Sequence, residues 1–111
     1  MWEIRMTDIL KKLNIILKDR KDKNSKESYV ASLYEKGFNH TCEKIDEESK
    51  ELINALKKES NERIISEAAD LWFHSLIALS MKNLSSDDIL EELQKRLGVS
   101  GHDEKKNRSS R

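Results

Sequence analysis

The most apolar stretch of the chain is EAADLWFHSLIAL, residues 67–79, and two acidic residues and a histidine interrupt it. A helix drawn through this stretch is apolar on nearly every side, which is typical of a buried helix. Glu67, Asp70 and His74 nevertheless lie along one of its faces, because side chains three and four residues apart are neighbours on a helix. Burying an unpaired carboxylate is costly, so the pattern calls for a partner. A cation in a cleft beside this helix would supply it.

A second acidic group precedes this stretch, in the pattern Lys44-x-x-Glu47-Glu48-x-x-Glu51. Like charges at these spacings destabilise a helix unless a cation lies between them, and a hard divalent cation such as Mg²⁺ prefers carboxylate oxygens. A solvated charged face is the alternative, and spacing alone favours it for this group because lysine and glutamate are frequent throughout the chain. For the pair in residues 67–79, whose neighbours are apolar, spacing leaves a metal site and a solvated face equally open.

The composition predicts one small all-α domain spanning residues 1–111. There are no prolines and three glycines, and 21 basic residues balance 21 acidic ones, so the formal charge is zero. That balance gives no indication of a nucleic-acid partner, and no stretch is long and apolar enough to predict a membrane span. The single cysteine, Cys42, cannot form an intrachain disulfide and fits a reducing, cytoplasmic location.

Apolar periodicity and capping residues predict about five helices, followed by a polar tail from about residue 99. The helices are expected to run from about Thr7 to about Lys18, from Ser28 to Gly37, from Asn39 onward, from Ser60 or Asn61 to about Lys82, and from Ser85 or Ser86 to Gly98. The buried side of the third is expected to comprise Ile45, Leu52, Ile53 and Leu56. Four short neighbours cannot cover a fourth helix that is apolar all round, so we expect a homodimer or higher homo-oligomer.

Four blocks of the sequence, spread from about Ile9 to Arg108, carry a resemblance to a known family. They are Arg20 with Ser28-Tyr29-Val30-Ala31-Ser32-Leu33 and Lys36-Gly37; Lys44-Ile45-Asp46-Glu47-Glu48-Ser49-Lys50-Glu51-Leu52; Glu67-Ala68-Ala69-Asp70-Leu71 with His74; and Gly98-Val99-Ser100-Gly101 with Glu104-Lys105 and Arg108. In order and spacing these blocks resemble the phosphoribosyl-ATP pyrophosphatases (pyrophosphohydrolases) of histidine biosynthesis. The acidic core alone would indicate only the wider MazG-type superfamily of all-α nucleotide pyrophosphatases. Val30 departs from the family, where threonine is usual.

The resemblance implies a MazG-type helical bundle and Mg²⁺-dependent hydrolysis of phosphoribosyl-ATP to phosphoribosyl-AMP and pyrophosphate, the second step of histidine biosynthesis. The implied metal ligands are Glu48, Glu51, Glu67 and Asp70. Glu47 and Glu48 are the candidate catalytic residues: Glu47 is a further ligand or the base that orients water, and the two could exchange roles. Candidates for contacts to substrate phosphates are Arg20, Lys44, Lys105 and Arg108. His74 is expected to be a hydrogen-bonded structural residue behind the ligands.

Two other functions compete with this hypothesis. A housecleaning pyrophosphatase acting on (d)NTPs would use the same carboxylates, although the Ser28-Tyr29 and Ser100-Gly101 pairs argue against it. A helical interaction module without enzymatic activity would leave the acidic face merely solvated. Replacing Asp70 by asparagine distinguishes the two enzyme hypotheses from the interaction module: under either enzyme hypothesis the variant should lose turnover and keep its helicity.

Overall fold

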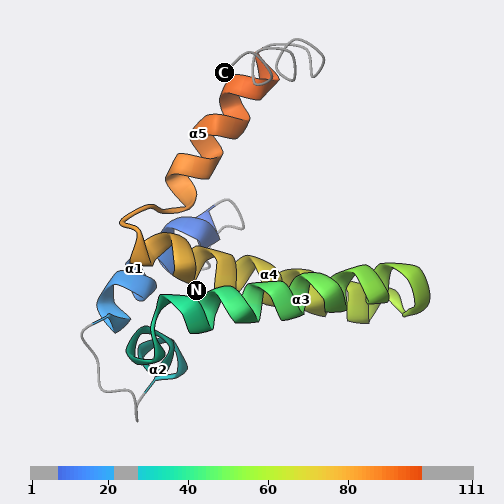
Figure 1. Ribbon diagram of the computed structural model, residues 1–111. Coiled ribbons are helices and arrows are strands. Elements are labelled where there is room, and N and C mark those ends of the chain that lie inside the picture. The colour runs from blue at the N-terminus through green and yellow to red at the C-terminus, as the bar shows by residue number, and fades with distance from the viewer. Residues whose placement is uncertain (1–7, 22–27, 99–111) are drawn as a thin grey trace, which may run out of the picture.

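The computed structural model describes residues 8–21 and 28–98, and within them the chain forms five α-helices and no strand (Figure 1). The helices are α1 (Ile9–Arg20), α2 (Tyr29–Lys36), α3 (Phe38–Lys58), α4 (Asn61–Met81) and α5 (Ser86–Leu97). The all-α prediction is confirmed, and the predicted helix bounds agree within a few residues. Two of the expected features, the Thr7 cap and the polar tail from about residue 99, lie outside the described residues. No helix within the described ranges is long and apolar enough to cross a membrane.

The two long helices, α3 and α4, form an antiparallel hairpin that dominates the molecule (Figure 1). The hairpin turns at Glu59 and Ser60, where both residues are extended and the Ser60 hydroxyl accepts a hydrogen bond from the Arg63 N–H at 3.4 Å. This is the serine N-cap expected at the start of the fourth helix. The helices α1 and α2 pack near the other end of the hairpin. The core there comprises Leu17, Val30, Leu33, Leu76 and Ile77.

A single glycine joins α2 to α3, and it replaces the asparagine cap expected from the sequence. Gly37 has φ 96°, a conformation that side chains other than glycine's rarely tolerate, and its N–H donates to Leu33 O at 3.0 Å. Because the chain turns at this one residue, α3 begins at once and the backbone N–H of Thr41 bonds to Gly37 O. The prediction of Asn39 as the N-cap is therefore wrong, since Asn39 already lies in the first turn.

The third helix buries a narrower face than the sequence predicts. Thr41, Glu48 and Ala55, each seven residues apart, are its buried residues, whereas Ile53 and Leu56 are 52% and 60% exposed. The expectation that these two residues are buried is wrong for the single chain, because α4 covers only one side of α3. The apolar stripe is wider than one neighbouring helix can cover, so part of it faces outward.

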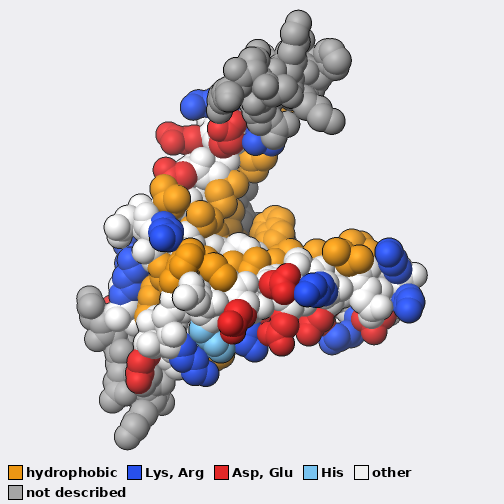
Figure 2. All heavy atoms as spheres, in the orientation of Figure 1, with side chains coloured by type: hydrophobic (Ala, Val, Ile, Leu, Met, Phe, Trp, Pro, Cys, Tyr) orange, Lys and Arg blue, Asp and Glu red, His pale blue; other side chains and the backbone are white. Residues whose placement is uncertain are grey.

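The helix α5 extends away from the hairpin, so that an angle opens between α5 and α4 (Figure 1). Its start is fixed by a capping box in which the Ser85 hydroxyl accepts a hydrogen bond from the Asp87 N–H at 3.2 Å and the Asp88 carboxylate accepts one from the Ser85 N–H at 2.9 Å. Apolar side chains line the angle, as the orange spheres between the two arms show (Figure 2). They enclose a groove of about 350 Å³ whose apolar lining includes Leu71, Trp72 and Leu90. Trp72 is 65% exposed, so α4 is not buried on all sides within one chain.

Candidate active site

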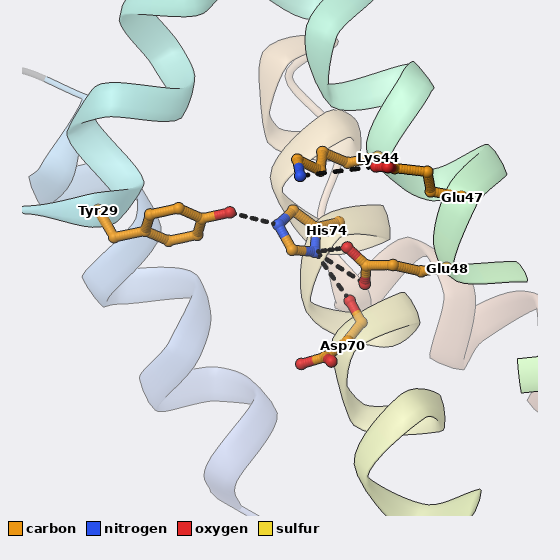
Figure 3. Close-up of polar contacts among 6 residues, drawn as sticks. All are labelled: Tyr29, Lys44, Glu47, Glu48, Asp70 and His74. Carbon is orange, nitrogen blue, oxygen red and sulfur yellow. Dashed lines mark hydrogen bonds and ion pairs between the residues drawn. The ribbon is translucent and has the colours of Figure 1, made fainter. Parts of the chain in front are cut away.

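The acidic residues of the two long helices meet in the middle of the hairpin (Figure 3). Glu48 comes from α3, and Asp70 and His74 come from facing turns of α4. The hairpin turn sets this register, because residues at similar distances from the turn on the two helices lie opposite each other. The two acidic patterns that are separate in the sequence are therefore adjacent in space.

Glu48 is buried at 7% exposure and is held by the imidazole of His74. Nδ1 of His74 lies 2.8 Å from Oε1 and 3.0 Å from Oε2 of Glu48, so one ring nitrogen faces both carboxylate oxygens. Burial raises the pKa of Glu48 because it disfavours the charged form, and the negative charge of Asp70 raises it further, while His74 and Lys44 act in the opposite direction. The net direction is upward, which means that this site favours a proton or another cation on Glu48.

Glu67 is the second buried carboxylate, at 4% exposure. Its Oε1 accepts a hydrogen bond from Nη2 of Arg63, one turn earlier on α4, at 2.5 Å. Its Oε2 is buried and has no hydrogen-bond partner among the described residues. The neighbouring Glu51 carboxyl, which can share a proton with Glu67, raises the pKa of Glu67, and burial adds to the effect against the opposing charge of Arg63.

Asp70 connects these two carboxylates electrostatically. Its side chain is exposed, which corrects the expectation that the apolar helix buries it. Its negative charge nevertheless raises the pKa of both Glu48 and Glu67. Together with Glu51, which acts on Glu67, these residues form one group of mutually repelling carboxylates. We call Glu48, Glu51, Glu67 and Asp70 the acidic cluster.

The chemistry of the acidic cluster fits a hard divalent cation. Its donors are all carboxylate oxygens, which Mg²⁺ prefers, and the buried Oε2 of Glu67 still needs a partner. Within residues 8–21 and 28–98, no three acidic, histidine or cysteine side chains already form an arrangement that could hold a metal ion. The reason lies in their present partners: Glu48 faces His74, and Glu67 faces Arg63. A bound cation would therefore compete with Arg63 for Glu67, whereas at Glu48 it would use the carboxylate acceptor positions that His74 leaves free.

The other predicted site residues lie at different distances from the acidic cluster. Glu47 is exposed and pairs with Lys44 at 3.5 Å, and the charge of Lys44 also reaches Glu48 (Figure 3). Arg20 lies at the end of α1, where Nη1 is 3.4 Å from Asp19 Oδ2, and no described contact joins Arg20 to the cluster. Lys105 and Arg108 lie outside the described residues.

Sequence reasoning assigned no chemistry to two residues that contact this site. Arg63, the partner of Glu67, stands four residues before it, and that helical spacing could have revealed the pair. Tyr29 donates or accepts a hydrogen bond at Nε2 of His74 at 3.0 Å, across 45 residues of sequence. No spacing rule could reveal that contact, because it depends on how α2 packs against α4.

A shallow polar hollow of about 370 Å³ opens beside the acidic cluster. Glu51 contributes to its wall, and the side chains of Lys50, Asn54, Glu59 and Arg63 complete the lining. Two positively charged groups thus lie next to the carboxylates. This combination suits a ligand that brings its own negative charge together with a cation.

Comparison with known proteins finds related sequences over most of the chain. A model of the phosphoribosyl-ATP pyrophosphohydrolase family matches residues 10–97. The phosphoribosyl-ATP pyrophosphatase of Hydrogenovibrio crunogenus is 52% identical over 106 residues, which is 92% of this chain and 94% of that protein. The proteins of the same name from Vesicomyosocius okutanii and Azoarcus sp. are 49% and 45% identical, over 95% and 93% of this chain and 100% and 96% of their own lengths. The chain thus belongs to the phosphoribosyl-ATP pyrophosphohydrolase family.

Proposed function

We propose that the protein hydrolyses the α–β phosphoanhydride of phosphoribosyl-ATP in a Mg²⁺-dependent reaction and releases phosphoribosyl-AMP and pyrophosphate. This would make it the enzyme of the second step of histidine biosynthesis. The observation that carries the proposal is the acidic cluster, in which two buried carboxylates, Glu48 on α3 and Glu67 on α4, have raised pKa values. Family membership supplies the substrate, since the relatives carry the name phosphoribosyl-ATP pyrophosphatase.

In this proposal Glu48, Glu51, Glu67 and Asp70 hold the metal. Bound Mg²⁺ would neutralise charge on the phosphate oxygens and lower the pKa of water. Glu47, which is exposed and precedes Glu48 on α3, would orient a water molecule and accept its proton, and Glu48 remains the alternative for that role. The contact between Glu67 and Arg63 would have to loosen, which would release the guanidinium toward the polar hollow.

The polar hollow offers a place for the substrate's phosphates. Lys50 and Arg63 line it, and Lys44 lies on the same helix near Glu48. The remaining proposed phosphate contacts are Arg20, Lys105 and Arg108, which stay predictions. The location in the cytoplasm also stays a prediction.

Pyrophosphate release tests the proposed function directly. The purified protein should release pyrophosphate from phosphoribosyl-ATP when Mg²⁺ is present and should lose this activity when a chelator is added. A panel of dNTPs measured in parallel separates the housecleaning alternative, which predicts release from dNTPs but not from phosphoribosyl-ATP. Absence of release from every nucleotide would favour the interaction module.

We further propose that the enzyme is a homodimer or higher homo-oligomer. The groove between α4 and α5 exposes a broad apolar surface that includes Trp72, Leu90 and Leu93. Exposed apolar patches that extend over two helices are typical of protein contact surfaces, and burying each 100 Å² of apolar area stabilises a complex by about 2.5 kcal/mol before the costs of association. We take the partner of this surface to be a second copy of the same chain, which is present in any solution of the protein.

Leu90→Glu should convert the oligomer into monomers, because it introduces a charge into the groove at the middle of α5. Gln94→Glu adds the same charge to the same helix outside the groove and should leave the assembly unchanged. Size-exclusion chromatography with light scattering measures both masses. A wild-type protein that elutes as a monomer at micromolar concentration would contradict the proposed oligomer.

A further inference from the structure

We propose that Tyr29 and His74 act together as positioning residues that hold the Glu48 carboxylate ready for a divalent cation. The proposal rests on the proposed function, because it deepens the role of the acidic cluster. Tyr29 lies on α2, His74 on α4 and Glu48 on α3, so the contact chain joins three helices (Figure 3). The hydroxyl of Tyr29 is the outermost member of this chain.

The contacts around the imidazole determine which nitrogen carries the proton. Nδ1 of His74 faces only acceptors: the Glu48 carboxylate at 2.8 and 3.0 Å and the backbone oxygen of Asp70 at 3.0 Å. With Glu48 ionised, Nδ1 therefore donates, since an unprotonated Nδ1 would place two buried acceptors, the ring nitrogen and the Glu48 carboxylate, against each other with no hydrogen between them. In the neutral ring Nε2 then accepts, and the Tyr29 hydroxyl donates to it at 3.0 Å. The hydroxyl thus favours the tautomer that points its N–H at Glu48.

Two aromatic rings fix the plane of the imidazole in addition. The rings of Tyr29 and Phe73 meet it edge-on, with centroids at 6.0 and 5.7 Å. His74 itself is buried at 6% exposure, so water cannot readily replace these contacts. The orientation of the Nδ1–H bond is therefore set by packing as well as by hydrogen bonding.

The hydrogen bond from His74 leaves Glu48 able to bind a cation. An ionised carboxylate has about four acceptor positions, and one N–H shared between its two oxygens occupies only part of them. Histidine and carboxylate groups that bond behind a metal ligand orient that ligand, and their loss typically weakens metal affinity or activity by about 10–100-fold. His74 bonds to Glu48 in this way, and Tyr29 in turn bonds to His74.

A purely structural role is the competing explanation, and the chain contains a matched control for it. Tyr34 lies on the same helix α2, and its hydroxyl bonds to Ser80 and to Leu17 O in the core. Tyr29→Phe and Tyr34→Phe remove the same atom from the same helix. Only the first change lies in the contact chain that ends at Glu48.

Titration of the full-length protein with Mg²⁺, by calorimetry and by pyrophosphate release, tests the proposal. Tyr29→Phe should raise the Mg²⁺ concentration for half-saturation by about 10-fold, with little change in kcat at saturating Mg²⁺. Tyr34→Phe should lower the melting temperature and leave half-saturation unchanged. In a His74→Gln background, Tyr29→Phe should add no further effect, since the residue through which it acts is gone.

Unchanged Mg²⁺ half-saturation in Tyr29→Phe would overturn the proposal, as would an equal rise in Tyr34→Phe. The calorimetric titration keeps this result separate from the proposed function, because it needs no turnover. A wild-type protein that binds Mg²⁺ but releases no pyrophosphate would contradict the function alone. Weaker Mg²⁺ binding in Tyr29→Phe would still support the positioning role in that case.

Discussion

Asp70→Asn should abolish turnover while the protein keeps its helical fold. The side chain of Asp70 is exposed, so exchanging a carboxylate for an amide of the same shape leaves packing untouched. Its negative charge, however, acts on both buried carboxylates of the acidic cluster. Removing it takes away a proposed metal ligand and part of the field that attracts the cation. We expect a loss larger than the roughly 100-fold seen when groups behind a ligand are removed.

The measurements for Asp70→Asn are pyrophosphate release at several Mg²⁺ concentrations, Mg²⁺ binding by calorimetry, and helicity by circular dichroism. Glu91→Gln is the matched control, because it makes the same acid-to-amide change at an exposed position of α5, far from the hairpin's centre. It should retain wild-type turnover. Full activity in Asp70→Asn with normal Mg²⁺ dependence would remove Asp70 from the proposed ligand set.

Much of the fold follows from local sequence signals. Ser28, Ser60 and Ser85 each cap a helix through a side-chain hydrogen bond to a backbone N–H, as their types predict. Gly37 ends α2, also as predicted. The predicted start of α3 was wrong because one residue serves two helices. Gly37 ends α2 and is also the N-cap of α3, so no separate polar residue precedes α3. The predicted burial of Ile53 and Leu56 was also wrong, because periodicity shows which side of a helix is apolar but not whether a neighbouring helix covers it.

The candidate site follows from the sequence only in part. The spacing of Glu67 and Asp70 within an apolar stretch indicated an acidic site, and the structure places Glu48 beside them. His74 is buried and hydrogen-bonded, as expected from its apolar surroundings. The contacts that orient the site come from other elements, such as Tyr29 on α2, and packing between helices decides them. Local spacing carries no information about such contacts.

Glu67→Gln should remove Mg²⁺-dependent turnover and yet keep or increase the stability of the metal-free protein. The raised pKa of Glu67 means that its surroundings favour the neutral carboxyl, through the neighbouring Glu51 carboxyl and through burial, despite the charge of Arg63. A neutral amide satisfies the same preference and can donate a hydrogen bond toward Glu51. The lost ion pair with Arg63 costs little, because that guanidinium is more than half exposed.

The same shift in pKa predicts the pH dependence of the metal-free protein. A carboxyl whose pKa is raised by folding contributes stability that is fully present below its ordinary pKa of about 4.3 and is lost as the pH rises through the folded value. Glu48 and Glu67 both belong to this class. Their combined contribution should therefore decrease from about pH 4 toward neutral pH, where Mg²⁺ would restore stability by binding the folded state.

Thermal melting in a chelator and in Mg²⁺, from about pH 4 to pH 8, measures both effects. The melting temperature of the wild type should rise when Mg²⁺ is added at neutral pH. That of Glu67→Gln should rise little, and it should vary less with pH. Glu43→Gln, an exposed change on α3, should behave like wild type. A metal-free Glu67→Gln protein that melts well below wild type at pH 7 would show that the pair with Arg63 outweighs repulsion within the cluster. Glu67 would then mainly stabilise α4 through its ion pair with Arg63, and the result would argue against Glu67 as a metal ligand.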